Sequence, residues 1–257
     1  GFSIVEYPYY NAVTRGVDFE AMLGAISALE PDTVVVLHAC CHNPTGADLD
    51  LTQWQQLAQR LRERKLVPFV DLAYQGFDRG ISEDARSIQV LLDAGIETVL
   101  VANSYSKSFS LYGERVGALS LVCANADEAS RVRSQVKQTI RATYSNPPTH
   151  GAALVATILA DAELRALWES ELTTMRERIK SVRSGLVQRL AAAGRTDFAF
   201  IDRQTGMFSY SGLDPAQVTR LREEFAIYAV DSGRICVAAL NAGNLDHVAD
   251  AIVRVAA

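Results

Sequence analysis

A single lysine stands among hydroxyl side chains in the segment NSYSKSFSLYGERVG, which spans residues 103–117. Ser104 and Ser106 precede Lys107, and Arg115 follows it eight residues later between two glycines. A solvated surface lysine needs no such neighbours. Hydroxyl groups and a guanidinium, in contrast, are donors that bind a phosphate well. The segment therefore predicts a lysine that is positioned beside a phosphate.

Other polar residues follow two apolar runs that are typical of strands. Asn43, in HNPTG (42–46), follows the run 33–39, and Asp71 ends the run 66–71, with Tyr74 three residues later. The lysine segment itself follows a third run, 97–103. Parallel strands deliver their carboxyl ends to one edge of a sheet, where ligands bind. We therefore expect Asn43, Asp71, Tyr74 and Lys107 to converge on one site.

Each of these signals has a purely structural alternative. NPTG alone is a turn, in which proline and glycine set the backbone, and Asp71 alone could cap a helix. Lys107 alone could be a surface lysine. The stretch HACCH (38–42) invites a metal site, but strand alternation would place His38 and Cys40 on one face and Cys41 on the other. No metal is therefore expected, and neither a Walker loop nor a Gly-x-Gly-x-x-Gly motif is present.

The elements that must position these residues alternate between strand and helix patterns. This alternation predicts an α/β domain with a mostly parallel sheet, followed by a smaller α+β unit. We expect the large domain to cover residues 1–172 and the C-terminal domain residues 173–257. The predicted strands are 33–39, 66–71, 97–103, 117–123, FAFI (198–201), GMFSYSG (206–212) and ICVAAL (235–240). The predicted helices are 52–65, 85–95, 126–144, helical stretches between about 149 and 193, and 244–256, opened by Asn244.

Composition narrows the class of protein further. The formal net charge of the 257 residues is -5 and the pI about 5.4, so neither nucleic acid nor an anionic membrane is expected as a partner. No apolar run approaches the ~20 residues that span a bilayer, and GFSIVEYPYY lacks the layout of a signal peptide. Four cysteines in a chain of this length do not form a disulfide framework. We therefore expect reduced thiols and a cytoplasmic protein.

Taken together, the motifs resemble one known family. HNPTG, DLAYQGF, SYSKSFSLYGERVG, YSNPP and SGRICVA occur in the order and spacing of the class I, fold-type I pyridoxal-phosphate (PLP) aminotransferases. The resemblance looks closest to the bacterial aromatic (tyrosine) branch, with aspartate aminotransferases next. It implies a large domain whose mostly parallel sheet carries helices on both faces, plus the smaller α+β domain. It also implies that an N-terminal portion of the family is absent, so the sheet should expose edges and apolar surface.

The resemblance assigns cofactor roles to the residues singled out above. Lys107 would form the Schiff base with the PLP aldehyde and then move a proton during catalysis. Asp71 would pair with the pyridine nitrogen, and Tyr74 and Asn43 would hydrogen-bond the phenolic oxygen. Family members have a cis peptide bond at the position of Asn43–Pro44. The implied phosphate ligands are Ser104, Ser106 and Arg115.

Substrate roles follow from the same resemblance. Arg234, in SGRICVA, would clamp the substrate α-carboxylate, and Asn43 would be a further substrate-binding residue. Arg141, in IRATYSNPP, would reach into the neighbouring subunit's site and bind a distal carboxylate, which implies a homodimer. The expected reaction is ping-pong transamination between tyrosine or phenylalanine and 2-oxoglutarate.

Three alternatives to that reaction stay open. The first is a preference for aspartate. The second is another PLP reaction, such as decarboxylation or β-elimination, although two carboxylate-binding arginines favour a transaminase. The third is a catalytically inert fragment, because the phosphate-cradling loop of the family's N-terminal portion is missing.

Overall fold

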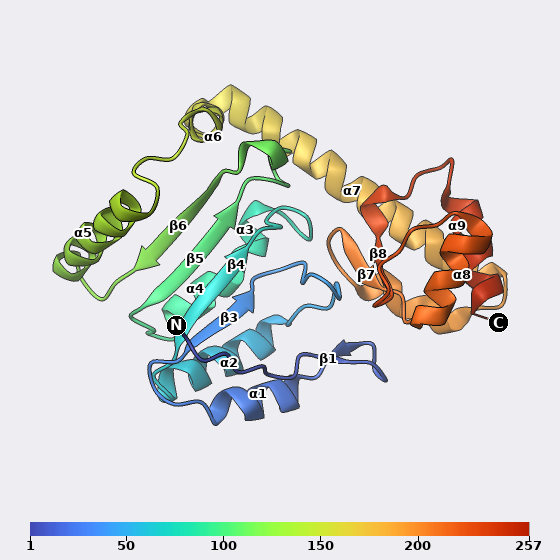
Figure 1. Cartoon of the computed structure of the whole chain (residues 1–257), viewed down its shortest axis with the longest axis horizontal. Coiled ribbons are helices and arrows are strands. Elements are labelled where there is room, and N and C mark those ends of the chain that lie inside the picture. The colour runs from blue at the N-terminus through green and yellow to red at the C-terminus, as the bar shows by residue number, and fades with distance from the viewer. Residues whose placement is uncertain (257) are drawn as a thin grey trace.

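The computed structural model describes residues 1–256 (Figure 1). The strands are β1 (Tyr10–Asn11), β2 (Gly16–Val17), β3 (Val34–His38), β4 (Val67–Leu72), β5 (Val99–Ser104), β6 (Gly117–Val122), β7 (Phe208–Tyr210) and β8 (Arg234–Cys236). The α-helices are α1 (Phe19–Ser27), α2 (Leu51–Glu63), α3 (Ile81–Asp84), α4 (Arg86–Asp93), α5 (Ala126–Thr143), α6 (His150–Ala160), α7 (Ala162–Ala192), α8 (Pro215–Phe225) and α9 (Leu245–Val255). Short 3₁₀ helices cover Tyr112–Glu114, Thr196–Arg203 and Val237–Ala239.

The central sheet has the strand order β3-β4-β5-β6. β3, β4 and β5 are parallel, and β6 runs antiparallel to β5. Parallel neighbours need a crossover connection, and helical segments such as α2 and α4 provide it. The prediction of an α/β unit with a mostly parallel sheet is confirmed, and the predicted strands of this sheet agree with the observed ones to within two residues.

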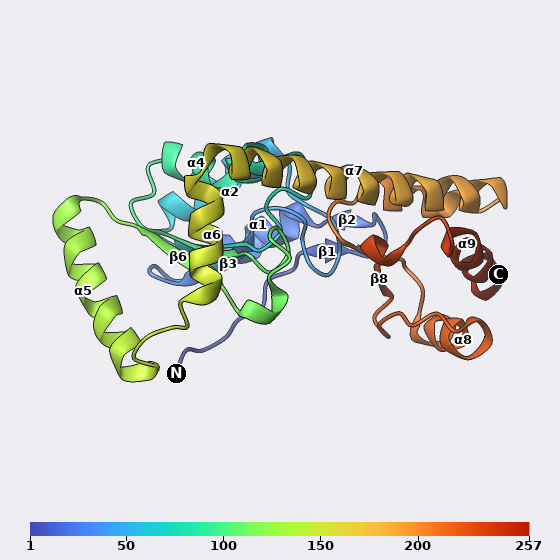
Figure 2. The ribbon, with the colours of Figure 1, turned by 90° about the horizontal axis from the view of Figure 1, so that it is seen from above.

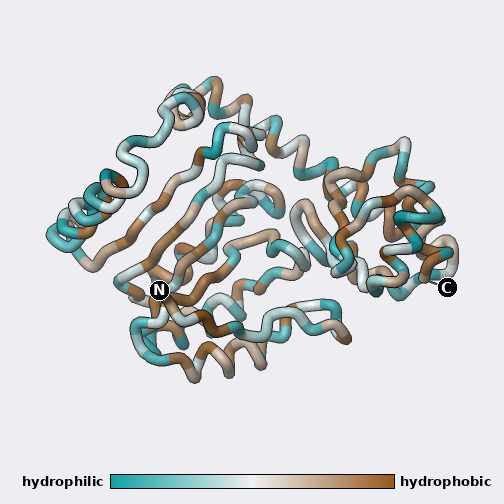
Figure 3. The backbone as a smooth tube through the Cα atoms, viewed as in Figure 1, coloured by the Kyte–Doolittle hydropathy of each residue, from teal (hydrophilic) through white to brown (hydrophobic). Residues whose placement is uncertain are grey.

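Helices cover one face of this sheet and form the core. Side chains alternate along β3, so Val35 and Leu37 are buried while their neighbours are not. α2 buries one apolar stripe against the same core, made of Trp54, Leu57, Ala58 and Leu61. Figure 2 shows α2, α4 and α7 on this side of the sheet. Hydrophobic residues accordingly occupy much of the central strands, whereas many residues of α5 are hydrophilic (Figure 3).

The other face of the sheet is largely open. Val34 is 43% exposed and Val36 is 54% exposed, so no helix of residues 1–256 buries them. Val36 lies opposite Phe69, and Asp71 lies opposite Ala102. Because side chains repeat every two residues, Asp71 and Ser104 belong to this same open face. The predicted exposure of apolar sheet surface is therefore observed.

Capping residues explain where two of the helices begin. Asp50 accepts a hydrogen bond from the Gln53 amide, and the Gln53 side chain accepts one from the Asp50 amide, so α2 starts with a capping box. Asp161 accepts from the amides of Glu163 and Leu164 at the start of α7. The helical stretch predicted between 149 and 193 is thus two helices, divided at Asp161.

α7 connects the sheet to the C-terminal unit (Figure 1). It packs against α6 near its start and against the 3₁₀ helix Thr196–Arg203 and α9 toward its end. β7 and β8 pair antiparallel beside these helices. The domain boundary at residue 172 falls inside α7 and stays a prediction. Among residues 1–256, no helix is both long and apolar enough to cross a membrane.

Two predicted strands of the C-terminal unit are wrong in detail. Residues 198–201 form part of a 3₁₀ helix instead of a strand, and the Ile201 carbonyl accepts from the Arg183 guanidinium. In 235–240 the strand stops at Cys236, because Leu240 donates to the Val237 carbonyl in a 3₁₀ turn. The prediction that Asn244 opens the last helix is confirmed, because Asn244 is the N-cap residue of α9; its side chain accepts from the Asn241 amide.

Gly206 is a position where the fold requires glycine. Its φ is +71°, and a Cβ there would lie 2.4 Å from the Cβ of Cys41 in the sheet unit. We expect Gly206→Ala to lower the free energy of unfolding by about 2–4 kcal/mol, through backbone strain plus this overlap. Urea unfolding followed by circular dichroism measures the change.

A matched control is Gly194→Ala. Gly194 also has a positive φ, +84°, but its added Cβ would meet nothing within 4 Å. Gly194→Ala should therefore lower the free energy of unfolding by only ~1 kcal/mol, through backbone strain alone. Equal losses in the two variants would contradict the role given to the contact with Cys41.

Candidate active site

Residues from three separate segments meet through hydrogen bonds beyond the carboxyl ends of the parallel strands. The Asn43 side-chain amide donates to the Tyr74 hydroxyl at 3.3 Å. The Arg234 guanidinium donates to the Asn43 side-chain oxygen at 3.0 Å. Asn43 follows β3, Tyr74 follows β4 and Arg234 opens β8. The structure therefore brings together three of the predicted site residues, 191 residues apart at the extremes.

Lys107 joins this group from the turn that follows β5. Its Nζ lies 4.8 Å from the centroid of the Tyr74 ring. Burial raises the pKa of the Tyr74 phenol, while the hydrogen bond from Asn43 opposes the rise. The phenol is therefore protonated at neutral pH. Because it accepts from Asn43, its own proton is free to be donated to a ligand oxygen.

Arg234 is also held by an aromatic ring. Its guanidinium carbon lies 4.7 Å from the centroid of Phe208 in β7, and Phe208 in turn meets Tyr74 edge to face at 6.2 Å. A ring face attracts a cation and leaves the edge of the guanidinium available for an anion. Phe208 was not among the predicted site residues, although it lies in the predicted strand GMFSYSG.

Asp71 and Ser104 border a cavity on the open face of the sheet. The cavity has a volume of about 330 Å³, and Val36, Phe69 and Ala102 form its apolar floor. One oxygen of the Asp71 carboxylate accepts from the Ala73 amide at 3.0 Å. A larger cavity, about 400 Å³, lies between residues 13–15 and 195–217 and contains none of the predicted residues.

Of the three predicted phosphate ligands, Ser104 and Ser106 directly precede Lys107, and Arg115 follows the 3₁₀ helix Tyr112–Glu114. The Ser104 hydroxyl accepts from the Ser106 amide at 3.2 Å, and Ser106 is buried. Arg115 has a left-handed backbone, and its guanidinium donates to the Tyr112 carbonyl at 3.0 Å. Two hydroxyls and one guanidinium without a carboxylate contact suit an anion.

Arg141 stands apart from the other predicted residues. It lies in the last turn of α5 and its guanidinium donates to the Ser145 hydroxyl. Figure 1 shows α5 beyond the end of the sheet that faces away from the C-terminal unit. The structure therefore does not place Arg141 with Lys107 and Arg234 of the same chain. Its predicted role across a dimer interface stays a prediction.

A cluster of aromatic rings supports the loop of Asn43, and sequence reasoning missed it. Tyr9 stacks on His42 at 4.0 Å, and His42 meets His38 edge to face at 4.7 Å. His38 ends β3 directly opposite Asp71, and its buried Nδ1 has no hydrogen-bond partner. His38 and His42 both belong to the HACCH stretch, which is the sequence signal for this cluster.

Strand alternation does not separate Cys40 from Cys41, contrary to the prediction from sequence. β3 ends at His38, and Cys41 has a left-handed φ of +53°, so the two-residue repeat does not continue to the cysteines. Both thiols are buried and close together.

The Asn43–Pro44 bond is cis, as predicted.

Asp48 holds the loop from inside and was also missed. Its carboxylate accepts from the amides of Cys41 at 2.6 Å and His42 at 2.7 Å. It also accepts from the Thr205 hydroxyl at 2.5 Å, which ties the loop to the C-terminal unit. The Tyr210 amide adds a bond to the Thr45 carbonyl. These contacts set the position of Asn43 relative to Arg234.

His42 gives the loop a pH dependence. Burial, and secondarily the neighbouring His38, lowers its pKa from 6.5 to about 3. Above pH 6.5 both the folded and the unfolded chain carry neutral His42. Below it the unfolded chain gains a proton that the folded chain refuses, so stability falls as the pH decreases from 6.5 toward 3. Between pH 7 and pH 5 we expect a loss of about 1–2 kcal/mol from this residue.

Urea unfolding at pH 7 and pH 5 tests this expectation. In His42→Asn the difference in the free energy of unfolding between pH 7 and pH 5 should be smaller by that amount. His247→Gln, at an exposed histidine, should leave it unchanged. An unchanged pH dependence in His42→Asn would overturn the assignment.

The sequence profile described as Aminotransferase class I and II matches residues 1–252. The chain belongs to this aminotransferase family. Its PLP-type fold agrees with the solved neighbours: the aromatic-amino-acid aminotransferase from Burkholderia pseudomallei, covalently bound to pyridoxal phosphate, superposes with a TM-score of 0.97 at 60% identity over 99% of this chain.

Curated relatives of this aminotransferase chain carry two names. The aspartate aminotransferase of Pseudomonas aeruginosa is 55% identical over 99% of the chain. The aromatic-amino-acid aminotransferase of Escherichia coli is 48% identical over the same share. The chain spans 64% of the length of each, and also 64% of the Burkholderia protein.

Proposed function

We propose that this chain is the part of a PLP-dependent aminotransferase that carries the cofactor-binding lysine. The enzyme would exchange an amino group between an aromatic amino acid and 2-oxoglutarate. One observation carries the proposal. Tyr74, Asn43 and Arg234 form a hydrogen-bonded series, and Lys107 lies against the Tyr74 ring. A reactive amine, a phenol and a carboxylate-binding guanidinium thus share one small site.

The residues present suit PLP. The cavity on the open sheet face presents the Asp71 carboxylate and the Ser104 hydroxyl, and an apolar floor suits an aromatic ring. When bound, PLP supplies an aldehyde for an amine and a ring that stabilises negative charge developing at the amino acid Cα. Asp71 would hold a proton on the ring nitrogen, because a carboxylate favours the charged form of a base beside it.

The other residues would bind and move protons around the reacting atoms. The Lys107 amine would take the proton from the substrate Cα and donate it to the carbon that carries the PLP aldehyde. Tyr74 and Asn43 would hydrogen-bond the phenolic oxygen. The phosphate would be held by Ser104, Ser106 and Arg115. Arg234 would bind the substrate α-carboxylate through its two-pronged guanidinium.

A homodimer completes the proposal. α5 is an 18-residue amphipathic helix that contains no buried residue. A helix with an apolar side usually buries it against a partner, and here we propose a second copy of the chain. Arg141 at the end of α5 would then serve the neighbouring subunit's site and bind a distal carboxylate. A cytoplasmic location remains part of the proposal, because the chain's cysteines are free thiols.

Covalent capture tests the cofactor step. The purified chain is mixed with pyridoxal phosphate, reduced with borohydride and mapped by mass spectrometry. An adduct confined to Lys107 is expected, since only this lysine lies in the assembled site. No adduct, or adducts spread evenly over the four lysines at 65, 107, 137 and 180, would contradict the proposal and favour an inert fragment.

The competing substrate is aspartate, because the 55% identical relative carries that name. Relative turnover of tyrosine, phenylalanine and aspartate with 2-oxoglutarate separates the two proposals. Aromatic turnover equal to or above that of aspartate is expected. An aspartate preference of several orders of magnitude would replace the aromatic assignment. Release of ammonia or carbon dioxide without an oxo acid would indicate another PLP reaction.

A further inference from the structure

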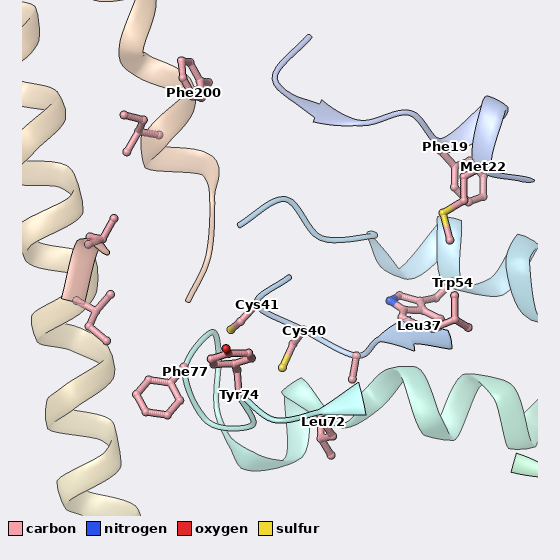
Figure 4. Packing of buried hydrophobic residues seen from close by; sticks show 14 of the residues in the cluster. Phe19, Met22, Leu37, Cys40, Cys41, Trp54, Leu72, Tyr74, Phe77 and Phe200 are labelled. Carbon is pink, nitrogen blue, oxygen red and sulfur yellow. The ribbon is translucent and has the colours of Figure 1, made fainter. Parts of the chain in front are cut away.

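Two adjacent thiols lie buried beneath the loop that carries Asn43. Cys40 is 6% exposed and Cys41 is 2% exposed. Their sulfur atoms and a carboxylate oxygen of Asp84 all lie within 4.8 Å of one another. Figure 4 shows both sulfurs directed to the same side of the loop. The arrangement is independent of the hydrogen-bonded series that defines the candidate active site.

The backbone explains why neighbouring cysteines face the same way. Successive side chains of an extended segment point to opposite sides. Cys41 instead has a left-handed φ of +53°, which reverses its direction. Its amide is held by Asp48 at 2.6 Å, and its Cβ lies against Gly206. The pair is therefore fixed by contacts from both the sheet unit and the C-terminal unit.

Asp84 is not a free third ligand. Its two oxygens accept from four backbone amides of the loop after β4, at 2.8–3.3 Å, from Gly76, Asp78, Arg79 and Gly80. A carboxylate committed to four donors has little capacity left for a metal ion. Zinc in structural sites takes four ligands, which this cluster does not offer. Two thiols without further ligands suit a soft metal or metalloid atom that binds through only two sulfur atoms.

We propose that Cys40 and Cys41 form a buried dithiol site that binds trivalent arsenicals through both sulfur atoms. The neighbouring Cys40 thiol and burial raise the pKa of Cys41, so it is protonated at neutral pH. An aryl arsenic oxide reacts with two such thiols without any oxidant. Two As–S bonds form, the As–O bond breaks, and the two thiol protons leave with the oxygen as water. Arsenic stays trivalent throughout.

Burial sets the rate of capture. Cys41 is covered by Gly206, so the arsenical must enter while the contact between the loop and the C-terminal unit opens. Capture should therefore be slower than the alkylation of the exposed Cys236 thiol by N-ethylmaleimide. Once formed, the two-sulfur ring should resist a competing monothiol, because loss of one As–S bond leaves the other in place.

The test uses phenylarsine oxide on the folded chain, followed by intact mass and peptide mapping. We expect one phenylarsenic unit in place of two hydrogens, bridging Cys40 and Cys41. The adduct should survive excess 2-mercaptoethanol and be removed by 2,3-dimercaptopropanol. Cys40→Ser and Cys41→Ser should each lose the monothiol-resistant adduct, whereas Cys123→Ser and Cys236→Ser should keep it.

Several results would overturn the proposal. These are no adduct on the folded chain, an adduct located at Cys123 or Cys236, or complete removal by the monothiol. Circular dichroism establishes whether each serine variant is folded. If Cys40→Ser or Cys41→Ser fails to fold, the peptide map and the monothiol challenge of the unmodified chain decide the question alone.

Discussion

Lys107→Ala is expected to abolish covalent capture of pyridoxal phosphate and to lower transamination by about 10⁴-fold, the upper range for loss of a proton-transferring group. Alanine removes the amine that lies 4.8 Å from the Tyr74 ring centroid and leaves Tyr74, Asn43 and Arg234 in place. The defect should therefore lie in turnover, with little change in substrate affinity. Borohydride-reduced adduct and initial rates measure the two effects.

Lys65→Ala is the matched control. Lys65 is exposed in the turn between α2 and β4, at the amino end of β4 and so away from the carboxyl ends of the parallel strands that carry the site. Its replacement should leave both the adduct and the rate unchanged. If Lys107→Ala retained a specific adduct, another lysine would be the cofactor residue and the candidate site would be wrong. If both variants lost the adduct equally, capture would reflect general lysine chemistry.

Arg183→Ala is expected to lower the free energy of unfolding by about 3–5 kcal/mol. Arg183 is only 3% exposed on α7, and its partners are neutral oxygens. Its guanidinium donates to the carbonyls of Ile201 at 3.0 Å, Gly206 at 2.7 Å and Phe208 at 3.2 Å, and to the Ser209 hydroxyl. Alanine would leave these acceptors buried and unpaired beside a cavity.

Desolvation lowers the pKa of Arg183 to about 10, so it remains charged at neutral pH. Urea unfolding at pH 7 measures the loss. Arg178→Ala is the matched control, because Arg178 is exposed on the same helix and donates to two carbonyls, those of Ala238 and Leu240. Water replaces those bonds, so about 1 kcal/mol is expected there. Similar losses in the two variants would contradict the importance of burial.

Arg183 also links stability to the site. The segment that it holds, 201–209, supplies Thr205 to Asp48 and Gly206 to Cys41. It also carries Phe208, against which Arg234 packs. Loss of Arg183 should therefore disturb Asn43 and Arg234 together, whereas Lys107→Ala should leave the fold intact.

Local sequence patterns were sufficient for the sheet and for the residues at its edge. Apolar β-branched runs between helical repeats predicted β3, β4 and β5, since these patterns depend only on residues close in the chain. Polar residues directly after those runs predicted Asn43, Asp71, Tyr74 and Lys107, because parallel strands share a carboxyl edge. The motif resemblance added Arg234, which the structure places in hydrogen-bond contact with Asn43. It also added the cis bond at Asn43–Pro44, which the structure confirms.

Only the tertiary structure decided features that depend on contacts between distant residues. Asp48 and Thr205 are 157 residues apart, and no periodicity relates them. Residues 198–201 have an apolar pattern that suits a strand, yet Arg183 binds the Ile201 carbonyl and a 3₁₀ helix forms. The left-handed backbone at Cys41, held by Asp48, brings two thiols together that alternation would separate. Spacing in the chain therefore determined which residues reach the sheet edge, while long-range hydrogen bonds and packing decided how their loops are held.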